Sequence, residues 1–325
     1  MFEIVIDNRN GNLWNISQLV SEVQWKTSLI GKAGSMEVTF VKGGLYEDPG
    51  FQCSPGDIIR FKTPEANVFH GYIFTIDSGN DEAVQLTAYD QLRYLMANDT
   101  YVFANVTAGD IIRRIAQDFN LQVGTLADTG YRIPSMVEDN AKLLDMICKA
   151  LTLTLVSTGE NFVFYDDFGF LTLANVRDRM VDFYIGNHSL VYDFTHKRSI
   201  DTDTYNVVKF VQDNKSTGGR DVYMQQDSAN IAKWGKLQLY QVVDENQNAA
   251  QINASLARTM ELKNRESLEV QVEAIGDLRL RAGSYVRVAL EEFGINQPCL
   301  ITECTHTFQG SDHTMSLDLR VVERL

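Results

Sequence analysis

The sequence has few of the residues that mark stapled domains or secreted proteins. It contains four cysteines in 325 residues, Cys53, Cys148, Cys299 and Cys304, and none of them forms a C-x-x-C pair. This count is too low for a disulfide framework, so we expect reduced, mostly packed thiols. The N-terminus has no basic stretch followed by an apolar run, and no run of about 18 apolar residues occurs. These absences favour synthesis in a cytoplasm without Sec export and without insertion into a membrane.

Basic residues are also scarce, because 29 Lys and Arg stand against 43 Asp and Glu, for a formal net charge of −14. The basic residues are scattered along the chain and form no stripe. The charge therefore argues against a function in neutralising the phosphates of a nucleic acid, and we expect no specific nucleic-acid partner. An acidic surface could still line a channel through which nucleic acid slides, since repulsion prevents sticking.

Motifs for nucleophilic catalysis and phosphate binding are missing. No G-x-S-x-G is present, and the segment Gly31–Ser35 lacks the P-loop order of glycines, lysine and hydroxyl. The best metal candidate is the set Cys304, His306 and His313, because alternate residues of a strand share a face and His313 begins the partner strand. A packed thiol beside cross-strand histidines is the favoured interpretation, so we expect no metal and no cofactor.

Paired carboxylates occur at Asp166-Asp167 and Glu291-Glu292, both beside glycine in expected turns. Neighbouring residues of a strand point to opposite sides, whereas acid–base catalysis needs two carboxyls in one cleft. Aromatic residues between 165 and 170 are typical of a core, although an exposed sugar platform stays open. We expect solvated turns and no catalytic residue.

Hydrophobic periodicity divides the chain into three domains. Residues 1–103 alternate with period two, as in Met36–Phe40 and Val84–Tyr89, which predicts short strands. Residues 104–195 begin with a helix capped by Thr107, followed by a second helix over 140–151 and strands at 152–156, 161–165 and 170–173. This pattern indicates a small α/β insert. Residues 196–325 return to strands, interrupted by one long helix over 249–265.

Two segments of the outer domains match each other. Gly56-Asp57-Ile58-Ile59-Arg60-Phe61 aligns with Gly283-Ser284-Tyr285-Val286-Arg287-Val288, 227 residues later. Each is a tight glycine turn that opens a strand with an arginine at the same place. Two further strands follow in the same order, since Tyr72–Ile76 aligns with Leu300–Cys304 and Val84–Ala88 with Met315–Leu319. We therefore expect a duplicated β-unit, with Gly56, Asp57, Arg60, Gly283, Ser284 and Arg287 at its structural turns.

Several strings resemble the XkdQ/YqbQ-type tail proteins of prophages. They are Ala88–Leu95, Thr100-Tyr101 with Thr107–Ile112, Ile133–Met136, Asp166–Leu173, Ile231–Gly235 and Leu280–Ser284, in this order. The wider hub family more often has a Pro-Gly-Asp turn where this chain has Ala282-Gly283-Ser284. The resemblance spans nearly the whole chain.

This resemblance implies a baseplate hub related in fold to the N-terminal hub of VgrG spikes. The implied fold class is α+β and mainly β, with two related tail-tube-like β-barrels bracketing the α/β insert. The implied assembly is a homotrimer with pseudo-six-fold symmetry that joins the tail tube of a contractile phage tail, or of a bacteriocin-like particle, to a separate spike protein. The tape-measure protein is a further expected partner, and the virion tail or particle is the expected location.

Two other functions stay open from the sequence. A cell-wall hydrolase or carbohydrate-binding tail component would need facing carboxylates, such as Asp166 or Asp167, or a zinc site in a cleft of the insert. A minor subunit of a non-contractile tail would have the same fold but would belong to a different kind of tail.

Overall fold

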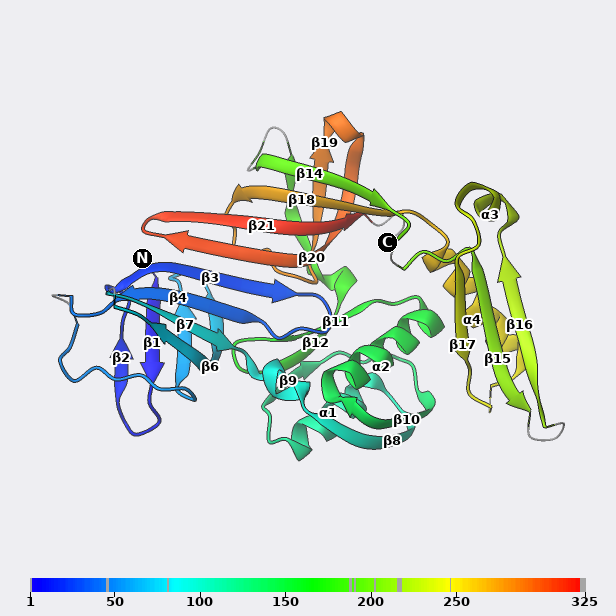
Figure 1. Ribbon diagram of the computed structural model, residues 1–325, viewed down its shortest axis with the longest axis horizontal. Helices are drawn as coiled ribbons and strands as arrows, with labels where there is room; N and C mark the ends of the chain where they lie inside the picture. The colour runs from blue at the N-terminus through cyan, green and yellow to red at the C-terminus, as the bar shows by residue number, and fades with distance from the viewer. Residues whose placement is uncertain are drawn as a thin grey trace.

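The structure is a computed structural model that describes residues 2–44, 47–80, 82–186, 189, 191–201, 203–214, 218–245 and 247–321, apart from the side chains of Phe183 and Phe293. The end of the last expected domain, residues 322–325, lies outside the described residues. The described elements form four parts, which Figure 1 shows from blue to red along the chain. No described helix is both long and apolar enough to span a bilayer.

The first β unit comprises the seven N-terminal strands. They are β1 (Glu3–Asp7), β2 (Leu13–Asn15), β3 (Val20–Ser28), β4 (Ser35–Val41), β5 (Ile58–Lys62), β6 (Asn67–Ser78) and β7 (Ala83–Tyr89). Their burial alternates along each strand, because successive side chains of a strand face opposite sides. The inward residues, among them Ile4, Val38, Phe61 and Leu86, pack into one core. The alternation predicted from the sequence is confirmed in these strands.

The second β unit comprises six strands from the later part of the chain. They are β13 (Met180–Gly186), β14 (Val191–Ser199), β18 (Ser267–Ile275), β19 (Tyr285–Leu290), β20 (Ile295–Gln309) and β21 (Asp312–Val321), with the 3-10 helix η3 (Glu291–Phe293) after β19. Their core includes Val272, Val288, Cys304 and Leu317. Strands β13 and β14 lie here, although the sequence placed residues up to 195 in the insert. Their position follows from pairing with β19 and β18, which lie roughly 70 to 105 residues later and give no local signal.

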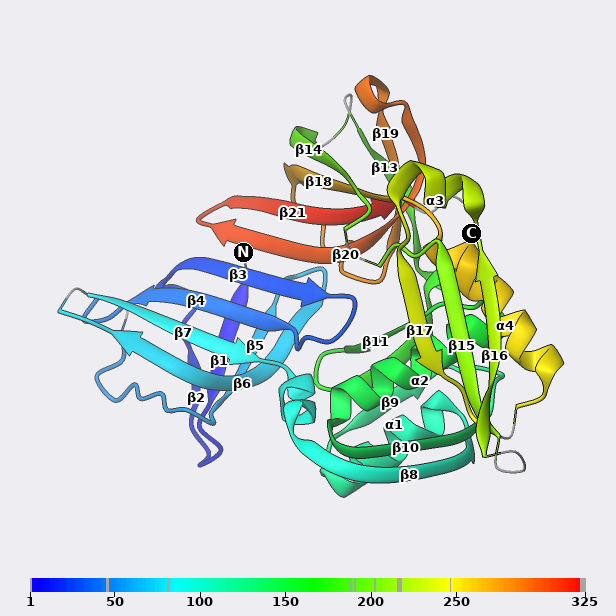
Figure 2. The same ribbon diagram turned by 45° about the vertical axis from the view of Figure 1, so that its right-hand side comes forward.

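The two β units share one 13-stranded sheet. Its order is β14-β18-β21-β20-β3-β4-β7-β6-β5-β1-β2, with β19 beside β20 and β13 beside β19. Figure 2 shows β20 of the second unit running along β3 of the first. Among the described strands no pairing joins β14 to β2, so the sheet is open and the expected closed barrels are not confirmed. The mainly β, α+β class is confirmed.

The α/β insert lies below the second β unit and to the right of the first in Figure 1. It contains β8 (Asn98–Val106), α1 (Ala108–Asp118), β9 (Val123–Leu126), β10 (Ile133–Lys142), α2 (Leu143–Thr158), β11 (Phe162–Asp166) and β12 (Leu171–Asn175), flanked by the 3-10 helices η1 (Gln91–Met96) and η2 (Val176–Arg179). The predicted cap is confirmed, because Thr107 and Asp110 form a reciprocal capping box at α1. The predicted strand at 152–156 is wrong. Helix α2 continues through it, buries Thr154 and ends at the left-handed Gly159.

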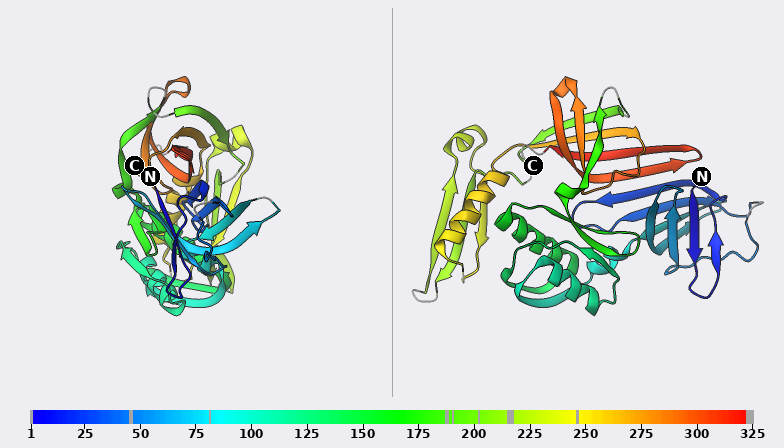
Figure 3. Two further views of the ribbon diagram at one scale, coloured as in Figure 1. Left: turned by 90° about the vertical axis from the view of Figure 1, so that its left-hand side faces the viewer. Right: turned by 180° about the vertical axis from the view of Figure 1, so that it is seen from behind.

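The satellite unit occupies the right side of Figure 1 and the left side of the rear view in Figure 3. Strands β15 (Val207–Asn214), β16 (Gly219–Gln226) and β17 (Gln238–Val242) form a separate three-stranded sheet, accompanied by α3 (Ser228–Trp234) and α4 (Ala249–Lys263). Helix α4 is the predicted long helix, and its Ile252, Leu256 and Met260 cover Val208 and Phe210 of the sheet. The sequence had grouped these residues with the last β domain.

Candidate functional site

The two glycine turns singled out in the sequence have the same backbone geometry. Gly56 and Gly283 have φ of +97° and +83°, a region that favours glycine. The Gly56 N–H donates to the Ile73 carbonyl at 2.7 Å, and the Gly283 N–H donates to the Ile301 carbonyl at 2.9 Å. In return, the N–H of Ile73 donates to the Asp57 carbonyl, and the N–H of Ile301 donates to the Ser284 carbonyl, both at 2.9 Å.

The side chains at these turns make different contacts. Asp57 accepts hydrogen bonds from the side chain of Asn8 and the N–H of Ser54, so it ties its turn to the first unit. Ser284, which is buried, accepts from the Arg179 guanidinium at 3.4 Å.

The two matched arginines also differ in their partners. Arg60 pairs with Asp7 at 2.9 Å, whereas Arg287 donates to the Asn296 side chain. The six predicted turn residues therefore occupy matching backbone positions, and they do not converge on one site.

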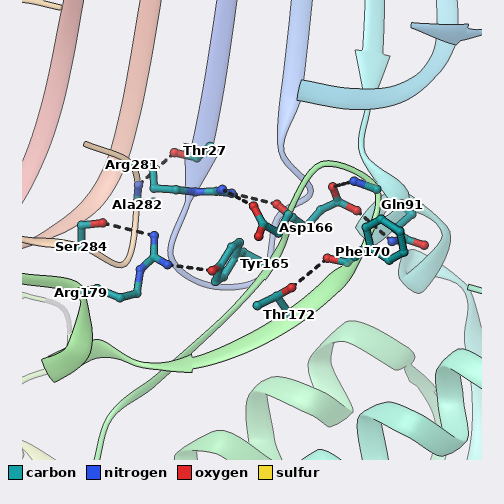
Figure 4. Close-up of polar contacts among 12 residues, drawn as sticks. Thr27, Gln91, Tyr165, Asp166, Phe170, Thr172, Arg179, Arg281, Ala282 and Ser284 are labelled. Carbon is teal, nitrogen blue, oxygen red and sulfur yellow. Dashed lines mark hydrogen bonds and ion pairs between the residues drawn. The ribbon is translucent and has the colours of Figure 1, made fainter. Parts of the chain in front are cut away.

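A polar junction lies where the first β unit, the insert and the second β unit meet (Figure 4). Arg281, on the loop before β19, donates to the backbone carbonyl of Asp166 at 3.0 Å. The next residue, Ala282, donates its N–H to the Thr27 hydroxyl at 3.0 Å. Gln91 donates its side-chain amide to the Asp166 carboxylate at 2.9 Å. One loop of the second unit thus contacts the other two parts.

Two guanidinium groups lie close to one aromatic ring in this junction. Arg281 lies 4.4 Å and Arg179 4.6 Å from the centroid of the Tyr165 ring. Arg179 also donates to the Tyr165 hydroxyl at 2.8 Å. Attraction between the cations and the ring face favours this arrangement, most strongly where water is excluded. The stack joins the end of the insert to the loop of the second unit.

Two buried carboxyl groups complete the polar junction. Asp90 accepts hydrogen bonds from the N–H groups of Gly34 and Leu92, and Asp166 accepts from Gly169. Burial, together with the nearby Asp166 charge, raises the pKa of Asp90 well above its usual value. Burial likewise raises the pKa of Asp166. The hydrogen bonds from the Gly169 N–H and the Gln91 amide, and the charge of Arg281, each lower that pKa and offset part of the rise. The junction is an internal, hydrogen-bonded joint.

The carboxylate pairs proposed from the sequence do not face one cleft. Asp166 is 6% exposed and already hydrogen-bonded, whereas the neighbouring Asp167 side chain is 62% exposed. Glu291 and Glu292 lie exposed in η3, far along the chain from both. This geometry fits structural use of Asp166 better than acid–base chemistry, which needs two groups on one substrate.

The three residues considered as metal ligands, Cys304, His306 and His313, lie together in the fold, where they form a hydrogen-bonded cluster. His306 is fully buried; its Nε2 donates to the Leu280 carbonyl at 2.8 Å, so its Nδ1 accepts from Nε2 of His313 at 2.9 Å. The Sγ of Cys304 lies 3.2 Å from the same Nε2 of His306. Within the described residues no group of three or more His, Cys, Asp or Glu is arranged to hold a metal ion.

Comparison with known proteins identifies the family. The model of the YQBQ-like family matches residues 23–320. The chain belongs to this family. It is 34% identical over 278 residues to the uncharacterized protein YqbQ of Bacillus subtilis, covering 84% of this chain and 83% of that protein. It is 32% identical over 295 residues to the phage-like element PBSX protein XkdQ of the same organism, covering 89% and 88%.

The fold is shared with solved phage tail proteins. The 43 kDa tail protein of prophage MuSo2 from Shewanella oneidensis superposes with a TM-score of 0.71 at 15% identity, over 98% of both chains. The family resemblance expected from the sequence is confirmed.

The polar junction went unrecognised in the sequence, although its residues lie in strings that carry the resemblance. Asp90 and Gln91 belong to Ala88–Leu95, Asp166 begins the string Asp166–Leu173, and Arg281 lies in Leu280–Ser284. Three strings that are far apart in the chain therefore meet at one place in the fold. Their separation hid the junction, because local patterns do not predict contacts between domains.

Proposed function

We propose that this chain is a structural component of a phage tail or tail-like particle, the homotrimeric baseplate hub between a contractile tail tube and a central spike. Family membership and the tail-protein fold support the tail assignment. Tail-tube and spike proteins are the partners in this proposal, with the tape-measure protein as a further one. The particle is the proposed location.

The strand order of the two β units is the observation that carries the proposal. In the first unit the neighbours run β3-β4-β7-β6-β5-β1. In the second they run β14-β18-β21-β20-β19-β13. The first four neighbouring pairs are antiparallel in both units. The last pair differs, because β1 pairs antiparallel with β5, whereas β13 pairs parallel with β19. Five strands in a row thus have the same order and direction, which supports a duplicated unit.

The pairing registers agree at the level of single residues. Ile58 lies opposite Tyr72, as Tyr285 lies opposite Leu300, in the alignment expected from the sequence. The next ladder is interrupted between Ile73 and Thr75 in the first unit. The matching interruption falls between residues 301 and 303 of the second unit.

Beyond this irregularity the registers agree again. Leu86 lies opposite Ile76, and the aligned Leu317 lies opposite Cys304. A shared irregularity at the same place is hard to explain by chance, since β-bulges are specific features of a fold.

A duplicated unit gives each protomer two similar positions, so three protomers supply six. Such a ring matches a six-fold tube on one side and a three-fold spike on the other. The polar junction fits this role, because buried hydrogen-bonded charges fix one arrangement of the parts they join. The proposed mechanism is mechanical: the chain keeps the axis aligned while the sheath contracts.

Reconstruction of a particle by electron cryomicroscopy tests the function. We expect three copies of the chain in a ring at the end of the tail tube, in contact with the spike. A chain found elsewhere on the particle, or in a copy number other than three, would reject the hub. A tail without a sheath would reject only the contractile part of the proposal.

A further inference from the structure

The two β units of one chain are joined by an antiparallel pairing of β3 with β20. The register runs from Glu303 opposite Ser28 to Gln309 opposite Glu22. Lys26 binds the Glu303 carboxylate at 2.7 Å across this junction. The C-terminal half of β20 forms the junction, because its N-terminal half pairs with β19 on the same edge.

Because the two units are similar, each contains a strand edge that corresponds to one side of this junction and pairs with no other described strand. Strand β6 corresponds to β20, and β14 corresponds to β3. Among the described strands β14 pairs only with β18. Strand β5 pairs with β6 up to Tyr72, so residues 74–78 of β6 have no described strand on that edge. Each chain thus presents one edge of each kind, and exposed edges are sites for pairing with another chain.

We propose that β14 of one protomer pairs antiparallel with residues 74–78 of β6 in the next protomer, repeating the β3–β20 junction. This inference rests on the proposed trimeric hub and names the surfaces that would hold it together. The contact is head-to-tail, so it closes a ring when three copies return to the first. Six similar junctions would then alternate around the ring, three within chains and three between them.

The register of the new contact follows from the pairings inside the chain. In the first unit Val23 of β3 faces Val38 of β4, which in turn faces Leu86 of β7. In the second unit Phe194 of β14 faces Val272 of β18, which in turn faces Leu317 of β21, the residue aligned with Leu86. Phe194 therefore corresponds to Val23. Three residues further along, Lys197 of β14 therefore corresponds to Lys26 of β3. On the other side, Asp77 of β6 corresponds to Thr305, the residue that faces Lys26.

The chemistry of the two edges agrees with this register. Strand β14 repeats the side-chain types of β3 at three positions, with Asp193 for Glu22, Lys197 for Lys26 and Ser199 for Ser28. The predicted register places Lys197 of one protomer directly opposite Asp77 of the next. Opposite charges at facing positions stabilise an antiparallel pair, whereas like charges would destabilise it. The Lys197 side chain is 71% exposed and lies 3.8 Å from Glu269, so it is available for a new partner.

Disulfide trapping tests this contact in the full chain. Particles are assembled with Asp77→Cys and Lys197→Cys in a Cys53→Ser, Cys148→Ser background, which removes the less buried native thiols. Facing residues of antiparallel strands lie about 4.5 to 5.5 Å apart at Cα, a separation that permits a disulfide. After mild oxidation, non-reducing electrophoresis is expected to show a ladder that ends at three copies.

A matched control places the second cysteine four residues away, as Asp77→Cys with Asp193→Cys. Strand geometry puts that position about 14 Å from the facing residue, so no disulfide is expected. Bands that stop at two copies would indicate a closed two-fold contact and overturn the inference. Monomers in particles whose hub is trimeric by cryomicroscopy would reject this pairing and leave the hub standing. A hub that is not trimeric would reject both.

Charge exchange provides a second measurement if the cysteine variants assemble poorly. Lys197→Asp alone or Asp77→Lys alone is expected to weaken incorporation into particles by roughly tenfold, since each places like charges opposite each other. The double exchange restores the pair and is expected to restore incorporation. Failure of the double variant to recover, where both single variants fold as judged by circular dichroism, would overturn the register.

Discussion

The buried histidine of the second β unit gives the protein a defined sensitivity to acid. His306 stacks on Trp25 with ring centroids 5.2 Å apart, and it is hydrogen-bonded to Leu280 and His313. Burial lowers the pKa of His306 to about 4, and the neighbouring His313 adds to this effect. The folded protein therefore keeps this ring neutral at pH values where the unfolded chain protonates it.

The size of the effect follows from the difference between two pKa values. An unfolded histidine has a pKa of about 6.5, so His306 is shifted downward by roughly 2.5 units, at about 1.4 kcal/mol each. Between pH 6.5 and 4 the unfolded state binds more protons, so the free energy of unfolding falls as the pH falls. About 3 kcal/mol of stability, present above pH 6.5, is lost by pH 4. The raised pKa values of Asp90 and Asp166 act in the opposite direction.

A variant isolates the histidine from these opposing groups. His306→Gln removes the titration, so urea unfolding at pH 7 and pH 4.5 is expected to show a smaller loss of stability in the variant, by about 2 to 3 kcal/mol. An equal pH dependence in His306→Gln and wild type would refute the reasoning.

Three further substitutions test the packing. Arg281→Leu removes the guanidinium that donates to the Asp166 carbonyl and is expected to cost about 1 to 3 kcal/mol in urea unfolding, because a buried acceptor loses a charged donor; a cost well below about 1 kcal/mol would contradict a structural joint. Gly283→Ala is expected to cost about 1 to 3 kcal/mol, since φ is +83° and the new Cβ would lie 2.4 Å from a side-chain methyl of the insert; Gly310→Ala, whose Cβ meets open space, should cost less. Leu317→Ala in the second core is expected to lower the thermal midpoint, with a cost of about 2 to 5 kcal/mol.

Local signals in the sequence predicted the elements whose structure is set locally. The alternation in Met36–Phe40 gave β4, and the Thr107 cap gave the start of α1. Helix α4 was also predicted within a few residues of its ends. These elements were predictable because strand alternation, capping and helical periodicity each depend on neighbouring residues.

Signals that compete with tertiary packing misled the prediction. The run Thr152–Val156 is rich in β-branched and leucine residues, which favour strands, yet it forms the end of α2. Thr154 turns its hydroxyl to the carbonyl of Ala150, four residues earlier, so its polar group is satisfied inside the helix. Packing of this helix against α1 and α4 outweighed the weak local preference.

The correspondence of β14 with β3 was hidden for a different reason. Their spacing differs from that of the aligned glycine turns, because the whole satellite unit is inserted between β14 and β18, whereas a short loop joins β3 to β4. Only the pairings reveal that Lys197 stands where Lys26 stands. The similar side chains at three positions then become informative, since a register supplies the alignment that sequence spacing lacked.

The polar junction shows why a buried charge can matter more for arrangement than for stability. Arg281 brings a positive charge near two buried carboxyls, Asp90 and Asp166, which otherwise accept hydrogen bonds from neutral groups. An all-apolar contact would tolerate small shifts of the insert against the β units, because it has no directional bonds. The bond from Arg281 to the Asp166 carbonyl does not tolerate them. In the proposed hub, which would hold its axis under load, a directional bond between the parts of the chain resists such shifts better than an apolar contact.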